Sequence, residues 1–493
     1  MPPDNAQNPV LGIDLGTTFS SIARWTGRGT EVYQMHTGET ELQSAVYYNP
    51  GTKETLVGKL AYKKGLLEPD NLALGVKRKM DDNSQKIAIG GRDFSPVDLS
   101  SEILRYLYRN VEEKFPRGIF RSRGTVVTVP YYFKAHQCEN TRKAAEKADI
   151  QCLGILQEPI AASLQYAWDL VTEYPDEERE ETVLVFDLGG GTLDLTLFKL
   201  RLMNEKLLFE VLASGGDDRL GGMDFDRCLA ELLLEIAGLS LDDLPGMEKR
   251  RAWQRLIEQA ILAKETLSVT KEWYVGINNL VGEKHLDLTV KKEQFEECIT
   301  EYQDKVRDIL RQLWVTAKLR PEDVDRIVRV GGSSKIPCMQ DILRDAIGEE
   351  KMYAPKNELT AVAEGAALYA AYLDDPEVFG REIEVTTRTC HALGVEVMGG
   401  RFFVIIPPNR KAPCTSSHWF AKPELHVTSL DINVYQGTNR AVKNNSLIGT
   451  IKVRDLPPRQ VDIKVTFSVS GDQKLSVRTE YEGKEVQNIF TMQ

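Results

Sequence analysis

Two acidic, glycine-rich segments hold the residue types that could bind a phosphate chain together with a divalent cation. Residues 12–18 read GIDLGTT and residues 186–192 read FDLGGGT. Each segment follows an apolar run typical of a buried strand and continues into apolar and β-branched residues, as a hairpin would. An aspartate followed by glycine and threonine presents a carboxylate, backbone N–H groups and hydroxyls at one place. One copy could be an ordinary turn, but two copies in similar contexts indicate a duplicated fold with a nucleotide between its halves.

Several other residues fit the same site. Glu158 precedes a proline at the start of an alanine-rich helix, Asp194 lies two positions after Thr192 on a strand, and residues 331–333 form a third glycine turn. Taken singly, each has a structural alternative: a helix cap for Glu158, a surface position for Asp194 and an ordinary turn for 331–333. Lys77, in the sequence VKRK, would alone be assigned to a solvated charge run. The case for placing these residues in one site depends on their occurring together in the same sequence.

The aspartates of the two segments, Asp14 and Asp187, imply a cation. Carboxylates grouped beside a triphosphate would repel one another unless a metal were present. Mg²⁺ suits the site because it uses few carboxylates and retains several waters. A remaining carboxylate could orient or deprotonate the attacking water, and phosphoryl transfer otherwise depends on positioning and charge stabilisation. The sequence contains no GxxxxGK[ST] phosphate loop, no supporting motif for a serine or cysteine nucleophile, and no metal-ligand spacing among its six histidines.

The composition is that of an ordinary globular chain of two or three domains. The chain has 493 residues, of which 42% are hydrophobic and 27% charged, and its net charge is −11. An acidic chain lacks the basic surface that nucleic acid or an anionic membrane requires. Seven widely spaced cysteines without a CxxC pair argue against disulfides and zinc. Together with the absence of a signal-like N-terminus and of a long apolar span, they predict a cytoplasmic protein.

Two types of segment must position these residues. Strand-like runs and long helical patterns alternate from residue 10 to about 375, with helices expected at 134–147, at 361–371 and over much of 222–315. This alternation predicts an α/β architecture. Short alternating runs separated by turn residues follow, at 402–406, 431–435 and 461–467, and they predict an all-β domain. The expected domains are residues 1–376, a linker at 377–388 and the β domain at 389–493.

Six segments together resemble the seventy-kilodalton heat-shock chaperone family, which lies within the actin-like and hexokinase-like ATPase superfamily. They are residues 12–18, 128–133 (TVPYYF), 158–162 (EPIAA), 186–194, 220–226 (LGGMDFD) and 330–337 (VGGSSKIP). The β domain resembles the family's substrate-binding β-sandwich through residues 393–400 (LGVEVMGG), 435–437 and 465–467. The resemblance implies a duplicated, two-lobed actin-like ATPase domain with a ribonuclease-H-like fold, followed by a peptide-binding sandwich.

The resemblance also implies a role for each matching residue. Lys77, Glu158, Asp187, Thr192 and Asp194 would be catalytic, and Asp14 and Asp187 would hold Mg²⁺. Nucleotide contacts would come from Gly16, Thr17, Thr18, Gly189, Gly190, Gly191, Thr192, Gly221, Gly222, Lys264, Ser268, Gly331, Gly332, Ser333 and Lys335. The implied cofactors are ATP or ADP with Mg²⁺, and K⁺ is a further candidate ion.

The β domain carries the other implied site. By position in the family, Val395, Met398, Phe420, Leu430 and Ile432 would line a cleft for extended apolar peptides. The same residue types equally fit the core of a sandwich, and without the resemblance the core would be the better interpretation for most of them.

The sequence departs from the family pattern at several places. Ile261 and Glu265 stand where the family has Glu and Arg, so an arginine that could stack on adenine is missing. Cys138 replaces an arginine that the family uses as a relay, and Leu359 replaces an aspartate. Residues 383–387, IEVTT, differ from the family's leucine-rich linker. Because the family continues into a helical lid, the sequence predicts either a naturally lidless member or a shortened chain.

Three functions are compatible with these observations. The leading one is an ATP-hydrolysing chaperone that binds unfolded peptide, with a J-domain co-chaperone and a nucleotide exchange factor as candidate partners. The altered residues favour, as the alternative, a chaperone-related regulator or exchange-factor relative with weak ATPase activity. A small-molecule kinase of the same superfamily is disfavoured by the peptide-binding character of the β domain.

Overall fold

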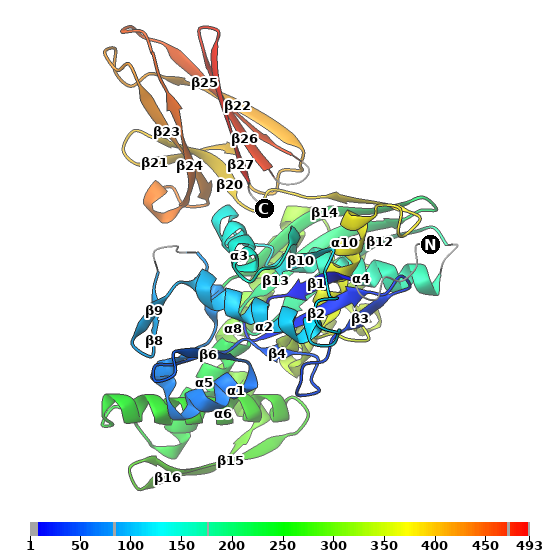
Figure 1. Ribbon diagram of the computed structural model, residues 1–493, viewed down its shortest axis with the longest axis vertical. Helices are drawn as coiled ribbons and strands as arrows, with labels where there is room; N and C mark the ends of the chain where they lie inside the picture. The colour runs from blue at the N-terminus through cyan, green and yellow to red at the C-terminus, as the bar shows by residue number, and fades with distance from the viewer. Residues whose placement is uncertain (1–7, 82–84, 175–176, 471–473, 492–493) are drawn as a thin grey trace.

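Two sheets with the same strand arrangement form the core of the first 375 or so residues (Figure 1). The computed structural model describes residues 8–81, 85–174, 177–470 and 474–491. The first sheet has the order β11 (Cys152–Gln157), β10 (Gly124–Val129), β1 (Val10–Asp14), β2 (Phe19–Trp25) and β3 (Thr30–Val32), and β4 (Leu42–Gln43) pairs with β2. The second has the order β18 (Met352–Tyr353), β17 (Arg326–Val330), β12 (Arg179–Leu188), β13 (Leu193–Leu202), β14 (Lys206–Asp217) and β19 (Glu382–Thr386).

The strand that carries each acidic motif occupies the same place in its sheet. β1 is parallel to β10 and antiparallel to β2, and β12 is parallel to β17 and antiparallel to β13. The two predicted hairpins are therefore confirmed. Each glycine-rich turn lies where its hairpin reverses direction, so the two turns occur at equivalent positions in the two sheets.

Two helices lie between these sheets, namely α4 (Glu158–Glu173) and α10 (Ala361–Asp374). One buried cluster joins them to both sheets and includes Val10, Leu164 and Val185. The approach of α10 to β1 is very close, since a Cβ atom on Gly12 would lie 2.1 Å from the Ala367 backbone nitrogen. Small side chains on α10 and a glycine on β1 are what allow this packing, and the predicted alanine-rich helix is confirmed.

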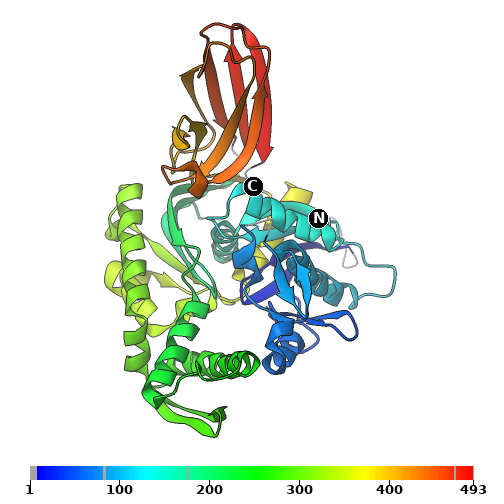
Figure 2. The same cartoon turned by 90° about the vertical axis from the view of Figure 1, so that its left-hand side faces the viewer.

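Each half has its own outer helices, and Figure 2 shows the two halves side by side beneath the β domain. The first half adds α1 (Lys59–Leu67), α2 (Pro96–Glu112), α3 (Ala135–Lys147) and the short strands β5 (Val46–Asn49), β6 (Glu54–Val57), β7 (Leu72–Ala73), β8 (Ile87–Ile89) and β9 (Arg92–Phe94). The second half adds α5 (Gly222–Ala237), α6 (Gly246–Leu267), α7 (Lys292–Cys298), α8 (Thr300–Ala317) and α9 (Pro337–Ile347). The helix-rich prediction for 222–315 missed one hairpin, formed by β15 (Glu272–Val281) and β16 (Lys284–Lys291).

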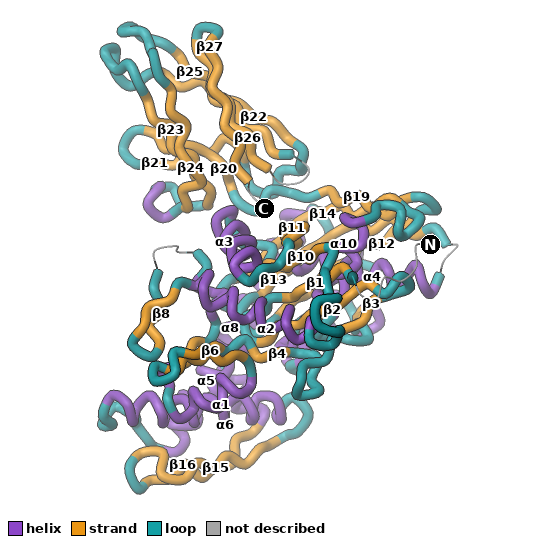
Figure 3. Tube along the Cα trace, viewed as in Figure 1, coloured by secondary structure: helices purple, strands orange, loops and turns teal. Residues whose placement is uncertain are grey.

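The C-terminal part contains strands and turns but almost no helix (Figure 3). Its two antiparallel sheets are β21 (Arg401–Ile406), β20 (Ala392–Val397), β23 (Leu430–Gly437), β24 (Ser446–Val453), and β22 (Cys414–Ala421), β25 (Asp462–Val469), β26 (Lys474–Tyr481), β27 (Lys484–Thr491). Inward-facing residues of both sheets, such as Val434 and Phe467, form a common buried cluster. The predicted all-β character of this part is confirmed.

The segment predicted as a linker contains a strand. Residues 382–386 form β19, which pairs in parallel with β14 at the edge of the second sheet. Ile383 and Val385 pack against the cluster between the sheets, and Lys206 forms a 2.8 Å ion pair with Glu382. Alternating apolar and acidic residues suit an edge strand with one buried face. Among the described residues, no helix has the length and apolar character needed to cross a membrane.

Candidate nucleotide-binding site

One cavity of about 520 Å³ lies where the two halves meet. It brings together residues from the first glycine-rich turn, the second one and the third turn at 331–333. The predicted residues that line it are Asp14, Gly16, Thr17, Thr18, Lys77, Glu158, Asp187, Gly189, Gly190, Gly191, Thr192, Gly222, Lys264, Ser268, Gly331, Gly332, Ser333 and Lys335. Gly221 and Asp194 are buried next to these residues without lining the cavity.

The glycine turns of the two halves touch each other. A Cβ atom on Gly190 would lie 1.9 Å from Thr18 Oγ1, and one on Gly221 would lie 2.6 Å from the Gly191 nitrogen. The amide of Gly222 donates to the Gly189 carbonyl at 3.0 Å, which ties the start of α5 to the second turn. Only glycine permits backbones to approach this closely. The three segments therefore form one concave, amide-rich surface, which suits an anion.

Three carboxyl groups and one ammonium group line the end of the cavity where the phosphates are predicted, and the Asp194 carboxyl group is buried beside them. Lys77 donates a hydrogen bond to Glu158, and both side chains are buried. Thr128 Oγ1 donates to Asp14 at 3.0 Å. Lys77 reaches the site from the short turn 76–79, Glu158 from the first turn of α4, and Asp14 and Asp187 from the ends of β1 and β12.

Burial changes the protonation of this cluster. It raises the pKa of Asp14 and Asp187, and it raises that of Glu158 to about 8 and that of Asp194 to about 6. Burial alone would lower the pKa of Lys77, but the charges of Glu158 and Asp14 outweigh it and raise the pKa. A bound cation would return the carboxyl groups to their ionised forms.

The residues at this end fit Mg²⁺. Asp194 Oδ2 and Thr18 Oγ1 are buried without a hydrogen-bond partner among the described residues, and carboxylate and hydroxyl oxygens are the ligands that a hard cation or its waters take. Within the same described part, no three His, Cys, Asp or Glu side chains are arranged to hold a metal directly. Mg²⁺ does not need three, because it binds through one or two carboxylates together with substrate phosphates and water.

The opposite end of the cavity is lined by α6 and by two loops of the second half. Ile261 and Glu265 of α6 line the cavity together with Ser268, the residue after this helix, and Glu358 and Leu359 are also part of the lining. Both departures on α6 therefore lie at the predicted base end. Glu265 thus puts a carboxylate at the position where an arginine side chain could have stacked on the aromatic ring of the base.

The two lysines predicted to contact the nucleotide are engaged in ion pairs. Lys264 lies 2.6 Å from Asp226, and Lys335 lies 3.3 Å from Glu358. Arg329 also contacts Glu358, at 3.1 Å. These pairings limit how far either ammonium can move towards a phosphate.

Sequence reasoning missed several residues that line the cavity. Asp226 ends the LGGMDFD segment, so its motif was a usable signal. Glu41 and Glu358 carry no motif, and their place depends on how separate loops meet. Burial and the nearby Asp14 charge raise the pKa of Glu41 to about 7, which adds a further titrating group to this cavity.

The structure divides the five residues predicted to bind peptide. Val395 and Ile432 are buried in the sandwich core, and Phe420 and Leu430 pack against it. Met398 is 77% exposed in the turn between β20 and β21. The core interpretation fits Val395 and Ile432, and Met398 is the member that a peptide could reach.

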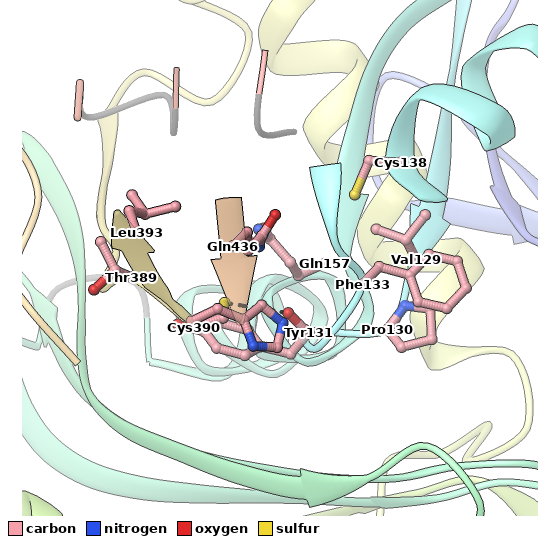
Figure 4. Close-up of a pocket in the computed structure, with 11 residues that line it drawn as sticks. Val129, Pro130, Tyr131, Phe133, Cys138, Gln157, Thr389, Cys390, Leu393 and Gln436 are labelled. Atoms are coloured by element: carbon pink, nitrogen blue, oxygen red, sulfur yellow. Dashed lines mark hydrogen bonds between the residues drawn. The ribbon is translucent and has the colours of Figure 1, made fainter. Parts of the chain in front are cut away.

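The β domain contacts the first half where residues 129–138 meet residues 389–393 and Gln436 (Figure 4). His391 Nε2 lies 3.1 Å from the Tyr132 carbonyl, and the Cys390 thiol donates to the Tyr131 carbonyl at 3.3 Å. The Ala135 amide, at the start of α3, donates to the Gln436 side chain at 3.2 Å. Cys138 lies in the same contact region, where the family has a relay arginine. Each of these three contacts joins a side chain on one side of the junction to a backbone group on the other.

Comparison with known proteins identifies the family. The sequence pattern of the family described as Hsp70 protein matches residues 10–88 and 79–493. The protein named Chaperone protein DnaK from Halobacterium salinarum is 33% identical over 491 residues, which cover 97% of this chain and 74% of that protein. The protein of the same name from Thermotoga maritima is 34% identical over 498 residues, covering 98% of this chain and 80% of that protein. The chain therefore belongs to the Hsp70 family.

Proposed function

We propose that this Hsp70 family member is an ATP-dependent molecular chaperone, which binds and hydrolyses ATP with Mg²⁺ and binds extended apolar segments of unfolded proteins. The observation that carries the proposal is the single cavity in which both acidic glycine turns, Lys77 and Glu158 meet. Relatives named as chaperone proteins support the general role. The matching strand order of the two sheets supports a duplicated actin-like arrangement.

The proposed domains are an ATPase domain at 1–376, a connecting segment at 377–388 and a peptide-binding sandwich at 389–493. The separate buried clusters of the sandwich and of the two halves support this division. The connecting segment adds β19 to the second sheet, so it can transmit strain between the domains as part of that sheet.

In the proposed mechanism, Asp14 and Asp187 would hold Mg²⁺, which neutralises phosphate charge when bound. The turns at 16–18 and 189–192 direct backbone amides at the phosphates. The Lys77 ammonium stabilises charge that develops on the phosphoryl group, and Glu158 holds Lys77 in place. Asp194, with its unpaired buried oxygen, is suited to orient the attacking water and accept its proton.

The remaining contacts are proposed from position. Gly221, Gly222, Gly331, Gly332 and Ser333 would border the nucleotide, with Lys264, Ser268 and Lys335 towards the base end. K⁺ is a further candidate ion beside the phosphates. J-domain co-chaperones and exchange factors are the proposed partners, together with unfolded peptide.

The alternative is a chaperone-related regulator or exchange-factor relative with weak ATPase activity, and the relatives named as chaperone proteins do not favour it. Two features of the cavity motivate it: Glu265 is part of its lining, where the resemblance implies an arginine, and Lys335 is paired with Glu358. Both reduce the positive charge available to a nucleotide.

The deciding experiment measures ATP binding and turnover by the full chain, with and without a leucine-rich peptide. Asp187→Asn serves as the inactive control. Turnover that rises with peptide supports the chaperone. Binding with negligible turnover supports the regulator, and absence of nucleotide binding would refute both.

A further inference from the structure

Arg78 follows Lys77 directly and joins the two halves behind the nucleotide cavity. Its backbone belongs to the short turn 76–79 of the first half. Its guanidinium reaches the second half, where Nη1 lies 3.1 Å and Nη2 2.5 Å from the two oxygens of Asp224. Nε donates to the Gly191 carbonyl at 2.8 Å, and Nη2 also donates to that carbonyl. We call these contacts the Arg78 clasp.

The clasp has a geometry that only arginine provides. A planar guanidinium can bind a carboxylate with two parallel hydrogen bonds while its Nε remains free for a third acceptor. Both side chains of the pair are one-fifth exposed, so the contact is shielded from solvent more than a surface ion pair. Asp224 is itself fixed, because its Oδ2 accepts the Gly221 amide at 2.9 Å at the start of α5.

The carbonyl that Arg78 binds belongs to the second glycine turn. In a trans peptide the C=O and N–H groups point in opposite directions. A Gly191 carbonyl held towards Arg78 therefore turns the Thr192 amide away from Arg78, and Thr192 lines the cavity. Glycine turns have little conformational preference of their own, so an external contact is needed to select one orientation.

We propose that Arg78 is a positioning residue for ATP hydrolysis. The clasp orients the Gly191–Thr192 peptide so that its amide faces the phosphates, and it holds Lys77 at the same place because the two residues are consecutive. Closing of the two halves and assembly of the phosphate site thereby become one event. This inference rests on the proposed function, since it concerns the same hydrolysis.

Single-turnover hydrolysis and nucleotide affinity test the inference in the full chain. Arg78→Ala is expected to slow single-turnover hydrolysis by roughly tenfold to a hundredfold, because small misplacement of reacting groups has effects of this size. ADP affinity should change by less than about threefold, since the glycine turns remain. Arg78→Lys should hydrolyse ATP about as slowly as Arg78→Ala, because an ammonium group cannot form the paired hydrogen bonds of a planar guanidinium. Millimolar guanidinium should restore part of the rate to Arg78→Ala and leave Arg78→Lys unchanged.

Two controls separate positioning from general stability. Arg24→Ala removes an arginine of similar exposure that pairs with Glu31 at 2.6 Å in the first half, and it should leave hydrolysis unchanged. The double variant Arg78→Ala/Asp224→Ala should be no slower than the slower single variant, since residues in one network are not additive. Wild-type hydrolysis by Arg78→Ala, or equal losses of rate and of ADP affinity, would overturn the inference.

Amide hydrogen exchange provides a readout that does not need turnover. Arg78→Ala should speed exchange in fragments that cover 76–79 and 189–192, and Arg24→Ala should speed it in neither. Unchanged exchange at 189–192 would refute the clasp as a positioning device. A wild-type chain that binds ATP without hydrolysing it would refute the ATPase part of the proposed function, while this exchange measurement would still decide whether the clasp orients the turn.

Discussion

Lys77 and Glu158 form a buried ion pair at the phosphate end of the cavity, although 81 positions separate them in the sequence. Lys77 comes from the short turn 76–79 of the first half, whereas Glu158 begins the helix that lies between the sheets. A buried pair of this kind is strongly disturbed when one partner is removed, because the other charge stays without compensation. The charges of Asp14, Asp187 and Asp194 act on this pair, and such a group of buried ionisable side chains points to chemistry rather than to stability.

Removing the ammonium group should affect hydrolysis more than binding. Lys77→Ala and Asp187→Asn are each expected to lower single-turnover ATP hydrolysis by more than roughly tenfold, because charge that develops on the phosphoryl group loses its stabilising partners. Nucleotide binding should persist in Lys77→Ala, since the glycine turns are intact. Lys79→Ala, from the same short turn but outside the cavity, is the matched control. A normal rate in Lys77→Ala would remove Lys77 from the mechanism.

Glycine at position 221 should be required for the contact between the turns. A Cβ atom there would lie 2.6 Å from the Gly191 nitrogen, so Gly221→Ala must displace one backbone. Such overpacking costs about 1–3 kcal/mol, and we expect Mg·ATP affinity to fall by roughly tenfold. Gly29→Ala is the control, because a Cβ atom at Gly29 meets nothing within 4 Å. Titration calorimetry measures the Mg·ATP affinity of both variants. Equal affinities would contradict the close approach of Gly221 to the Gly191 backbone.

The acidic glycine turns could be predicted from the sequence because a strand, an aspartate and a glycine turn are local features. The structure places them around one cavity, while their chemical roles stay predictions. Glu358 could not be found this way, because its pairing with Lys335 and Arg329 depends on how two loops fold together. The reach of Arg78 into the other half is equally a tertiary property.

Two elements were missed although a signal was present. Alternating apolar and acidic residues at 382–386 are typical of the edge strand β19, and a similar alternation marks the hairpin of β15 and β16. The sandwich shows the opposite case. Val395 and Ile432 have side chains that suit a core and a peptide cleft equally well, so residue type alone could not separate the two.

Restoring an arginine at the base end should tighten ATP binding. Glu265 lines that end of the cavity, and a carboxylate gains no cation–π attraction from an aromatic ring. Glu265→Arg should raise ATP affinity by roughly threefold to tenfold, and Glu265→Gln should raise it less because it only removes the negative charge. Calorimetry with ATP and GTP shows whether the gain depends on the base. No gain with ATP in Glu265→Arg would count against this assignment of the base end.

The junction between the domains should weaken in acid. Burial lowers the pKa of His391 below 6.5. The hydrogen bond to Tyr132 and the charge of Asp218 oppose this shift, and the charge of Lys134 reinforces it. Its Nε2 can donate to the Tyr132 carbonyl in either protonation state, so burial, and not this hydrogen bond, is what favours the neutral ring in the docked form. The stabilisation is complete above pH 6.5 and is lost as the pH falls below that value towards the lowered pKa of the docked form, because the separated domains bind the proton more readily.

Small-angle X-ray scattering across this pH range measures the separation of the domains. The wild type should extend as the pH falls, whereas His391→Gln, whose amide can donate to the same carbonyl without titrating, should not. An identical pH response in both proteins would assign the effect to other groups.

The last prediction concerns peptide binding by the sandwich. Met398 is 77% exposed in the turn after β20, so a charged residue there should leave the fold intact. If this turn contacts an extended peptide, Met398→Asp should abolish binding of a labelled leucine-rich peptide in fluorescence anisotropy, because burying one leucine contributes about 2 kcal/mol. The melting temperature of Met398→Asp should equal that of the wild type.

Val395→Asp is the contrasting variant, since Val395 is buried in the core and an unpaired charge there should unfold the domain. Loss of binding at an unchanged melting temperature would separate a recognition surface from a structural core. If the wild-type chain failed to bind the peptide even at high micromolar concentration, the client-binding role would fall, and the regulator would become the better account of this Hsp70 protein.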